Sequence, residues 1–396
     1  MNGSMRRGLD QAPATPDLWK ERWDVIIVGA RVAGAATALH LARAGHRVLI
    51  VDRAGPPKDT VSTHALMRSG VLQLSKLGVL ERIVEAGTPA IRQINLVFGS
   101  QQIKFPVAAA YGVDAYYAPR RTLLDTVLLE AAIDAGATFL GGSVSGVSHD
   151  SQGRVNGVMV RTETRESTIP ARWVVGADGT QSRVARSVGA QLLRYHPPAN
   201  GLVYGYFEGA DIPGYDFRFV NQRNVGAIPT NDGLTILFVG GPLAETPRDA
   251  ETYLQGTLAR VAPEFLVGAR RVGRLYRANS IPNLLRDPTG AGWCLVGDAG
   301  FTEDPISAHG ITDALRDAEF CAQAVDHALR DSGRESDAIS SYRPLRDQFA
   351  VPYLDHIVAL SSFVWDGPEA SRLMRGLGEI ADAECELLAS RLLIPA

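Results

Sequence analysis

The stretch VIIVGARVAGAATALHLARAGHRVLIVDR, residues 25–53, decides the fold of this chain. Two short apolar runs, Val25–Val28 and Val48–Val51, flank a segment whose apolar residues recur at helical spacing and which ends at Gly45. Short continuous apolar runs on either side of a helix are typical of parallel strands that are buried on both faces. The stretch therefore predicts a strand–helix–strand unit.

The glycines of this unit indicate a nucleotide site, although one of them is replaced. In a dinucleotide-binding unit the first glycine makes the tight turn, the second lets the backbone approach the pyrophosphate, and the third lets the helix pack on the strand. Gly29 and Gly34 stand at the first and third places, and Arg31 stands at the second. Arg31 gives up part of the close approach but brings a cation beside the phosphate. Asp52, after the second strand, can accept a ribose hydroxyl. Alone, the motif leaves a plain strand–helix–strand unit equally open.

Two later stretches extend the pattern. RWVVGADG, residues 172–179, and WCLVGDAG, residues 293–300, are apolar runs that are each followed by a helical pattern. This alternation favours an α/β sheet with helical crossovers. Residues 201–241, and the stretch around residues 94–107, instead alternate apolar and polar residues between turn signals, which predicts antiparallel strands.

Composition bounds the class of protein. The chain has 396 residues, 45% of them hydrophobic, and a formal net charge of −3, so we expect a large core and no nucleic-acid partner. No apolar run approaches the ~20 residues of a membrane span, and the N-terminus lacks the apolar segment of a signal peptide. Cys294, Cys321 and Cys385 have no metal-binding spacing and are expected to be buried free thiols. We expect a cytoplasmic protein without a metal site, and its oligomeric state stays open.

Three motifs together point to a family. WVVGADGTQSRVA, residues 173–185, and WCLVGDAGFTEDPISAHGITDALRDAE, residues 293–319, follow the first glycine unit in order. From Asp24 to Asp317 the chain resembles FAD-binding proteins of glutathione-reductase type, specifically the p-hydroxybenzoate-hydroxylase-like flavoproteins. That group includes class A flavin monooxygenases, geranylgeranyl reductases and flavin-dependent halogenases. The resemblance implies an α/β glutathione-reductase-type FAD-binding fold with an inserted antiparallel substrate sheet and a helical C-terminal region.

The resemblance also implies how the chain is divided. The expected parts are a disordered tail (1–22), a discontinuous FAD-binding domain (23–92, 112–196 and 272–345), a substrate-binding sheet domain (93–111 and 197–271) and a helical C-terminal region (346–396).

Cofactor contacts follow residue by residue from the family motifs. The resemblance places Arg121, in RRTLLDTVL, near the FAD pyrophosphate, with a solvated helix N-terminus as the alternative. It places Asp178 and Arg183 where FAD and the pyridine nucleotide route meet, and Asp298 on the ribityl chain. The predicted cofactor-binding residues are Gly29, Ala30, Arg31, Ala33, Gly34, Asp52, Arg53, Arg121, Asp178, Gly179, Arg183, Gly297, Asp298, Pro305, Gly310 and Ile311.

The last motif departs from the family pattern. The family often has His, Gly, Gln and Asn at the positions of Phe301, Ala308, His309 and Thr312. The backbone role survives these changes, whereas the shape and polarity beside the flavin differ. Independently of the family, a helix that begins after Gly310 would aim its positive N-terminus at the loop and would stabilise an anionic reduced flavin.

Three residues are candidates for catalysis. His64, in DTVSTHALMRSGVLQL, is a possible proton donor or covalent flavin attachment point, and a capping or packing histidine is the alternative. Asp304 and His309 are ionisable groups on the predicted flavin loop. Arg68 is predicted as a flavin or nicotinamide contact or as a surface residue. Tyrosines that line either the substrate side or the core are Tyr116, Tyr117, Tyr204 and Tyr206.

No second glycine unit followed by an acid occurs, so NAD(P)H is expected to bind transiently as the reductant. The resemblance then implies an FAD-dependent monooxygenase that oxygenates a small aromatic or polyketide-like molecule through a flavin C4a-hydroperoxide, with the flavin held non-covalently. A flavin-dependent reductase or dehydrogenase of the geranylgeranyl-reductase type is the alternative. A halogenase is less favoured because the WxWxIP pattern of tryptophan halogenases is absent. A non-catalytic FAD-binding module is the remaining possibility.

Overall fold

A computed structural model describes residues 16–53 and 62–391 of the chain. Part of the N-terminal segment expected to be disordered is ordered, because Pro16–Trp19 forms a 3₁₀ helix. Leu18 and Trp19 pack against the apolar core, and the Leu18 carbonyl accepts a hydrogen bond from Trp23 Nε1. Residues 1–15 lie outside the described part.

The first sheet carries the predicted parallel strands. Its main path runs β16 (Thr289–Gly290), β17 (Trp293–Leu295), β8 (Glu166–Gly176), β1 (Trp23–Val28), β2 (Val48–Asp52) and β5 (Thr138–Gly141), and β6 (Ser143–His149) and β7 (Val155–Arg161) join through β8. β1 pairs in parallel with both β2 and β8. Alternation along β1 explains its apolar run: Val25 and Ile27 pack on the helical side, and Ile26 and Val28 pack on the side of β6 and β7.

Helices cover one face of this sheet. They are α2 (Val32–Arg43), α5 (Arg121–Asp134) and α8 (Gly310–Arg330), with the shorter α3 (Arg68–Lys76), α4 (Leu80–Glu85) and α9 (Glu335–Ser340) around them. The short α6 (Arg183–Ser187) packs on the opposite face, on the side of β6 and β7. α2 packs against both α5 and α8. Its close packing requires glycine, because a Cβ at Gly34 would lie 2.0 Å from the Gly29 carbonyl oxygen. Gly29 itself has a φ of +111°, which L residues with side chains rarely adopt.

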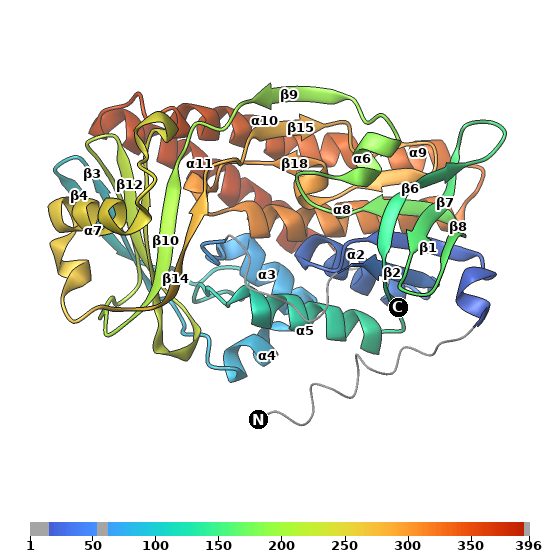
Figure 1. The fold of residues 1–396 in the computed structure, drawn as a ribbon, viewed down its shortest axis with the longest axis horizontal. Helices are drawn as coiled ribbons and strands as arrows, with labels where there is room; N and C mark the ends of the chain where they lie inside the picture. Colours follow the sequence, from blue (N-terminus) through green and yellow to red (C-terminus); the bar gives the residue numbers. More distant parts are fainter. Residues whose placement is uncertain (1–15, 54–61, 392–396) are drawn as a thin grey trace.

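The second sheet lies beside the first in Figure 1. Its order is β14 (Arg270–Ala278), β10 (Leu202–Glu208), β13 (Thr235–Gly240), β12 (Arg223–Pro229), β11 (Tyr215–Val220), β3 (Gln93–Phe98) and β4 (Gln101–Pro106). Pairing is antiparallel except between β11 and β3, the strands at which the two separate inserted stretches meet, which run parallel. β14 continues this sheet to Ala278, past the boundary predicted at residue 271.

Helices cover both faces of the second sheet. α7 (Ala250–Val261) packs on the outer face, and α10 (Tyr342–Ser361) and α11 (Gly367–Ser390) pack on the inner face. β10 shows the division, since Val203 and Phe207 belong to the outer cluster and Tyr204 and Tyr206 to the inner one. The predicted fold class, including the helical C-terminal region, is therefore confirmed.

A small third sheet joins the two parts. It consists of β18 (Phe301–Thr302), β15 (Asn283–Arg286) and β9 (Leu192–His196), and β9 runs along the top of the molecule in Figure 1. The three cysteines are free and buried, as predicted. Among the described residues, no helix has the length and apolar character needed to cross a membrane.

Candidate active site

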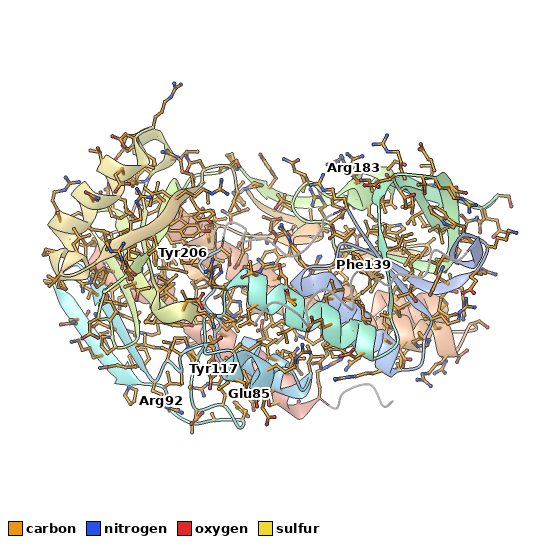
Figure 2. The ribbon with its side chains drawn as sticks, turned by 60° about the horizontal axis from the view of Figure 1, so that its bottom comes forward. Glu85, Arg92, Tyr117, Phe139, Arg183 and Tyr206 are labelled. Carbon is orange, nitrogen blue, oxygen red and sulfur yellow. The ribbon has the colours of Figure 1, made fainter. Side chains whose placement is uncertain are left out.

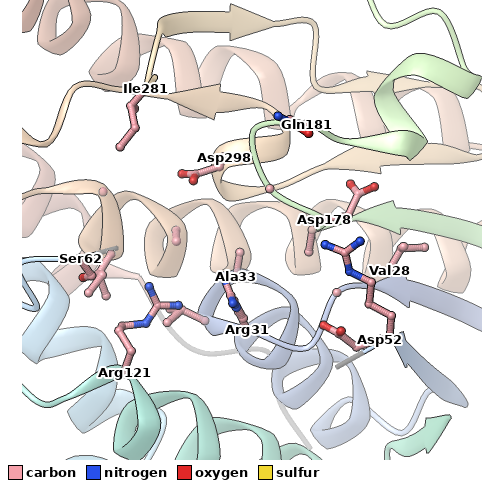
Figure 3. A pocket seen from close by; sticks show the side chains of 18 of the residues that line it. Val28, Arg31, Ala33, Asp52, Ser62, Arg121, Asp178, Gln181, Ile281 and Asp298 are labelled. Carbon is pink, nitrogen blue, oxygen red and sulfur yellow. The ribbon is translucent and has the colours of Figure 1, made fainter. Parts of the chain in front are cut away.

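A cavity of about 500 Å³ runs between the first glycine turn, the Asp178 loop and the loop that leads into α8. Figure 3 shows Asp52 and Asp178 at one end, and Ser62 and Ile281 at the other. We call the first the nucleotide end and the second the reaction end. The predicted site residues that line the cavity are Gly29, Arg31, Ala33, Asp52, Arg53, His64, Arg121, Asp178, Gly179, Arg183, Asp298, Pro305, Gly310 and Ile311. Those predicted for the site that do not line it are Ala30, Gly34, Gly297, Asp304 and His309.

The nucleotide end is built around the N-terminus of α2. Arg31 is the N-cap residue, makes no side-chain capping bond, and no acidic residue occupies the first turn. The first N–H groups of a helix have no partner within the helix and favour an anion. Arg31, Val32 and Ala33 line the cavity at this point, so the turn fits a pyrophosphate group. Figure 3 shows Arg31 and Ala33 at the centre of the cavity.

Ala30 and Gly34 do not line the cavity but support the nucleotide end from behind its wall. The Ala30 N–H donates to Asp52 Oδ2 at 2.8 Å, which fixes the carboxylate at the end of β2 beside the glycine turn. Gly297 plays a similar packing role, because a Cβ there would lie 2.8 Å from the Cβ of Ala33.

The loop after β8 has its own internal support. Asp178 Oδ2 accepts hydrogen bonds from the backbone N–H groups of Arg183 at 2.6 Å and Val184 at 3.2 Å. Gly179 has a φ of +80°, which explains the glycine of this motif. Asp178 Oδ1 is buried and has no hydrogen-bond partner among the described residues. This orphaned acceptor at the cavity wall is suited to a ligand hydroxyl.

Arg121 is held in place rather than solvated at a helix end. Its Nε and Nη2 atoms donate to the two carboxylate oxygens of Asp125 at 3.0 and 3.1 Å, and its side chain is only 11% exposed. Burial raises the pKa of Asp125, and Arg121 opposes that rise. The sequence analysis missed Asp125, although its place four residues after Arg121 on one helix allows the pair.

Asp298 reaches into the middle of the cavity in Figure 3. Thr180 Oγ1 lies 3.5 Å from Asp298 Oδ2, which connects this carboxyl to the Asp178 loop. Its side chain is exposed to solvent in the cavity. The protein around the carboxyl still disfavours its ionised form and raises the pKa of Asp298, and the charge of Arg121 acts against the rise.

His64 forms part of the reaction end and has an unusual backbone. It is a non-glycine residue with a φ of +64°, and its side chain is fully buried. Such a conformation costs ~1–3 kcal/mol and is concentrated at functional sites. His64 Nε2 lies 2.5 Å from the Tyr206 hydroxyl, and Nδ1 has no hydrogen-bond partner among the described residues. His64 does not cap α3, which begins at Arg68.

The protonation state of His64 follows from its surroundings. Burial lowers its pKa well below the ordinary value, and the charges of Arg121 and Arg120 lower it further. His64 is therefore neutral at pH 7 and cannot store a proton as an imidazolium. It can accept a hydrogen bond at one ring nitrogen while donating at the other.

Asp304 is buried behind the loop and does not line the cavity. Its Oδ1 accepts from Asn200 Nδ2 at 2.9 Å and from the Ile306 N–H at 3.0 Å. It thereby caps the short helix Pro305–Ser307. Burial raises the pKa of Asp304 to about 6. The structure thus gives this predicted catalytic residue a capping role.

His309 also points away from the cavity, into a buried charged cluster. Its Nδ1 lies 3.2 Å from Asp313 Oδ2, and its ring lies 4.6 Å from the Tyr353 ring. Burial would lower the pKa of His309, but Asp313 outweighs burial and raises it. His309, Asp313 and Glu384 bring atoms of metal-ligand type within 4.8 Å of one another, a group that sequence spacing did not predict. Arg316 already donates to both carboxylates, so a guanidinium supplies the cation there.

The other residues predicted around the substrate lie outside the cavity wall. Arg68 donates to the Ala108 carbonyl at 2.7 Å in an exposed hydrogen bond, which favours the alternative of a surface residue. Tyr204 and Tyr206 belong to the inner core of the second sheet, and the Tyr204 hydroxyl accepts from the Ser62 N–H. The sequence analysis missed Glu303, which does line the cavity.

The family of this chain follows from comparison with known proteins. Residues 22–356 match the family model described as FAD binding domain, so the chain belongs to that family. It is an FAD-dependent oxidoreductase with the α/β fold expected from the three motifs. The site fits that cofactor, because an uncapped helix N-terminus, Asp52 and the orphaned oxygen of Asp178 lie along one cavity.

Individual relatives carry several activities. The chain is 28% identical over 352 residues to a menaquinone reductase of Mycolicibacterium smegmatis, covering 82% of this chain and 80% of that protein. It is 27% identical over 332 residues to a 6-methylpretetramide 4-monooxygenase of Streptomyces rimosus, covering 78% of this chain and 57% of that protein. The flavin-dependent brominase Bmp2 shares the fold, with a TM-score of 0.78 at 19% identity over 94% of each chain.

Proposed function

We propose that this FAD-dependent oxidoreductase is a monooxygenase that uses NAD(P)H and O₂ to oxygenate a small aromatic or polyketide-like molecule. The observation that carries the proposal is the hydrogen-bonded pair His64 and Tyr206 at the reaction end. His64 lines the cavity, and its Nδ1 atom has no hydrogen-bond partner among the described residues. FAD, when bound, supplies the hydride acceptance and the reaction with O₂, and the protein supplies orientation, proton transfer and a dry pocket.

The pair is suited to activating a phenol. His64 Nδ1 can accept the phenolic proton while Nε2–H donates to the Tyr206 hydroxyl. Because an imidazolium is disfavoured at this buried position, His64 would pass the proton on rather than keep it. Removing that proton raises the electron density of the ring, which favours attack on an electrophilic oxygen.

Apolar surroundings support a substrate of this kind. Ala65 and Ile281 line the reaction end, and the inner core of the second sheet lies directly behind it. Figure 2 shows Tyr206 on the side of the second sheet, far along the molecule from Arg183 at the nucleotide end. A small organic molecule at the reaction end would therefore meet aromatic and aliphatic side chains, with water excluded by the core behind them.

A reductase is the second candidate, because the menaquinone reductase covers most of the chain and Glu303 places a buried acid in the cavity wall. Reduction of a double bond needs a hydride and a proton from such an acid.

One experiment separates the two. The FAD-loaded protein is given NADPH, isotopically heavy O₂ and a panel of phenols, polyketide-like aromatics and isoprenoid quinones, and products are analysed by mass spectrometry. A monooxygenase incorporates one heavy oxygen atom into an aromatic product and gives none without O₂. Full conversion under anaerobic conditions would move the assignment to a reductase, and no NADPH consumption with any compound would contradict both.

A further inference from the structure

Two carboxyl groups meet where the cavity wall joins the buried charged cluster. Glu303 lines the cavity yet is only 8% exposed, and Ser307 Oγ donates to its Oε1 at 3.1 Å. Its side chain contacts Asp313 at the start of α8. Glu303 Oε2 and Asp313 Oδ2 are both buried, and neither accepts a well-aligned hydrogen bond from any described residue. Two adjacent carboxylates cannot satisfy each other, whereas a carboxylic acid and a carboxylate can.

The charges of the cluster leave Glu303 without a cation of its own. Arg316 is fully buried and donates to Asp313, to Glu384 Oε2 at 2.7 Å and to Asp317 Oδ1 at 2.8 Å. The three carboxylates thus share one guanidinium, with His309 beside Asp313 as a second cation when protonated.

A third cation is only partly available to the cluster. Arg346 acts on Asp317, but its Nε and Nη2 atoms are bound to Asp347. If Glu303 were ionised, its negative charge would have no cation of its own to balance it. A buried carboxyl without a balancing cation retains its proton.

The titratable groups around Glu303 come from three helices and from its own loop. α8 contributes His309, Asp313 and Arg316, α10 contributes Tyr353, α11 contributes Glu384 through Arg316, and the loop itself contributes Asp304. Burial and then Asp313 raise the pKa of Glu303 well above its ordinary value, and Ser307 and Arg316 only partly oppose this. Burial also acts to raise the pKa of Asp313, but Arg316 and His309 outweigh it and lower that pKa. The shared proton therefore resides on Glu303.

We propose that Glu303 and Asp313 share one proton at neutral pH and that Glu303 delivers it at the reaction end, to the oxygen atom that leaves as water in the oxygenation or to the substrate in the reduction. The proposal rests on the redox function proposed above, since both candidate reactions consume one proton beside the hydride. Oxygenation balances as RH + O₂ + NAD(P)H + H⁺ → ROH + H₂O + NAD(P)⁺. Reduction balances as X=Y + NAD(P)H + H⁺ → HX–YH + NAD(P)⁺. Asp313 is a positioning residue here, because it acts only by holding the proton on Glu303.

Solvent returns the proton after each turnover. Glu303 is open to the cavity through its 8% exposed surface, while His309, Asp313 and Arg316 seal it from behind. Proton uptake and release therefore occur on the cavity side, where the substrate enters and the product leaves.

Infrared spectroscopy of the FAD-loaded protein tests the shared proton directly. We expect wild type at pH 8 to show the carbonyl band of a buried protonated carboxyl, and E303Q to lack it. D304N is the matched control, since Asp304 is the adjacent buried carboxyl but has a pKa of about 6 and is ionised at pH 8; it should retain the band. A band that survives unchanged in E303Q would overturn the proposal.

A glutamine at position 303 can still donate a hydrogen bond to Asp313 but cannot release a proton, so E303Q should keep its FAD and its melting temperature. Should E303Q lose FAD, D313N provides the second test. Removing the Asp313 carboxylate should lower the pH at which the carbonyl band of Glu303 disappears in a pH titration. An unchanged titration would contradict a proton shared by Glu303 and Asp313.

The second test measures turnover, with only NADPH and O₂ added to the FAD-loaded protein. The uncoupled reaction, NADPH + H⁺ + O₂ → NADP⁺ + H₂O₂, consumes the same proton. Wild-type rates should fall as the pH rises through the pKa of the pair, whereas E303Q should be ~100-fold slower at pH 7 and independent of pH in that range. An E303Q profile that matches wild type would refute proton delivery. Absent NADPH oxidation in the wild type would count against the proposed function, and the infrared result would still decide the shared proton.

Discussion

The two ends of the cavity bind by different means. At the nucleotide end, the groups that face the ligand are helix N–H groups and side chains open to solvent, such as Arg53 and Arg183. At the reaction end, His64 and Glu303 are buried. Burial lowers the pKa of His64 and raises the pKa of Glu303, so the neutral form of each side chain is favoured. A fixed backbone would therefore hold the cofactor, whereas the proposed chemistry depends on side chains whose charge is set by their surroundings. Substitutions should accordingly remove cofactor at one end and alter proton transfer at the other.

The largest effect is expected for Gly34→Ala, at the nucleotide end. Its new Cβ would lie 2.0 Å from the Gly29 carbonyl oxygen and 3.1 Å from the Ala177 Cβ, and neither neighbour is a flexible side chain that can move aside. We expect a protein that purifies without FAD or fails to fold, measured by flavin absorbance and circular dichroism. Gly378→Ala, in the middle of α11 with no atom within 4 Å of the added Cβ, is the matched control and should keep both. A yellow G34A protein would mean that backbone packing does not define this end.

The second prediction concerns the reaction end. His64→Ala should retain FAD but lower turnover ~100-fold, because it removes the ring that links the cavity to Tyr206. Tyr206→Phe should have a similar effect, and the double variant should be little worse than either, since both remove one relay. Acid precipitation should release flavin from the wild type into the supernatant. Flavin that stays with the wild-type pellet but not with the H64A pellet would instead identify His64 as an attachment point.

The contrast between the two ends also explains which site residues could be predicted from the sequence. Gly29, Asp52, Asp178 and Asp298 follow or end strands of the first sheet, and Gly34 lies in the helix directly after β1, so a short local motif is enough to place them at the site. The helix predicted after Gly310 is also present, as α8.

The reaction end could not be read in the same way. Glu303 becomes an acid only through Asp313 and Arg316, and Arg316 is charge-balanced by Glu384, 68 residues further along. His64 meets Tyr206 across 142 residues. Asp304 and His309 stand in the right loop, but their side chains turn into the core, and nothing in the local sequence fixes that rotation.

A third, smaller effect is expected where the two ends meet. Asp298→Ala should weaken FAD binding by ~10-fold or more, because it deletes a carboxylate in the middle of the cavity that can accept hydrogen bonds from the bound cofactor. Asp298→Asn keeps one acceptor oxygen and should lose less. Flavin retention during dialysis, followed by fluorescence titration, measures both. Equal losses for Ala and Asn would show that the charge, and not the hydrogen bond, matters.

The smallest effect is a pH dependence of stability at Asp304, behind the reaction end. Its pKa is about 6 in the folded protein against an ordinary value of 3.8, so the folded state binds this proton more tightly than the unfolded state. The stabilisation is complete below pH 3.8 and is lost as the pH rises through about 6. Between pH 5 and 8 this should lower the free energy of unfolding by ~1 kcal/mol. Asp304→Asn keeps an oxygen that accepts from Asn200 and Ile306 but cannot titrate, so the wild-type and D304N stability curves from urea unfolding should converge toward low pH and separate above pH 6. Parallel curves over that whole range would mean that Asp304 is already ionised in the folded protein, and that its buried hydrogen bonds outweigh desolvation.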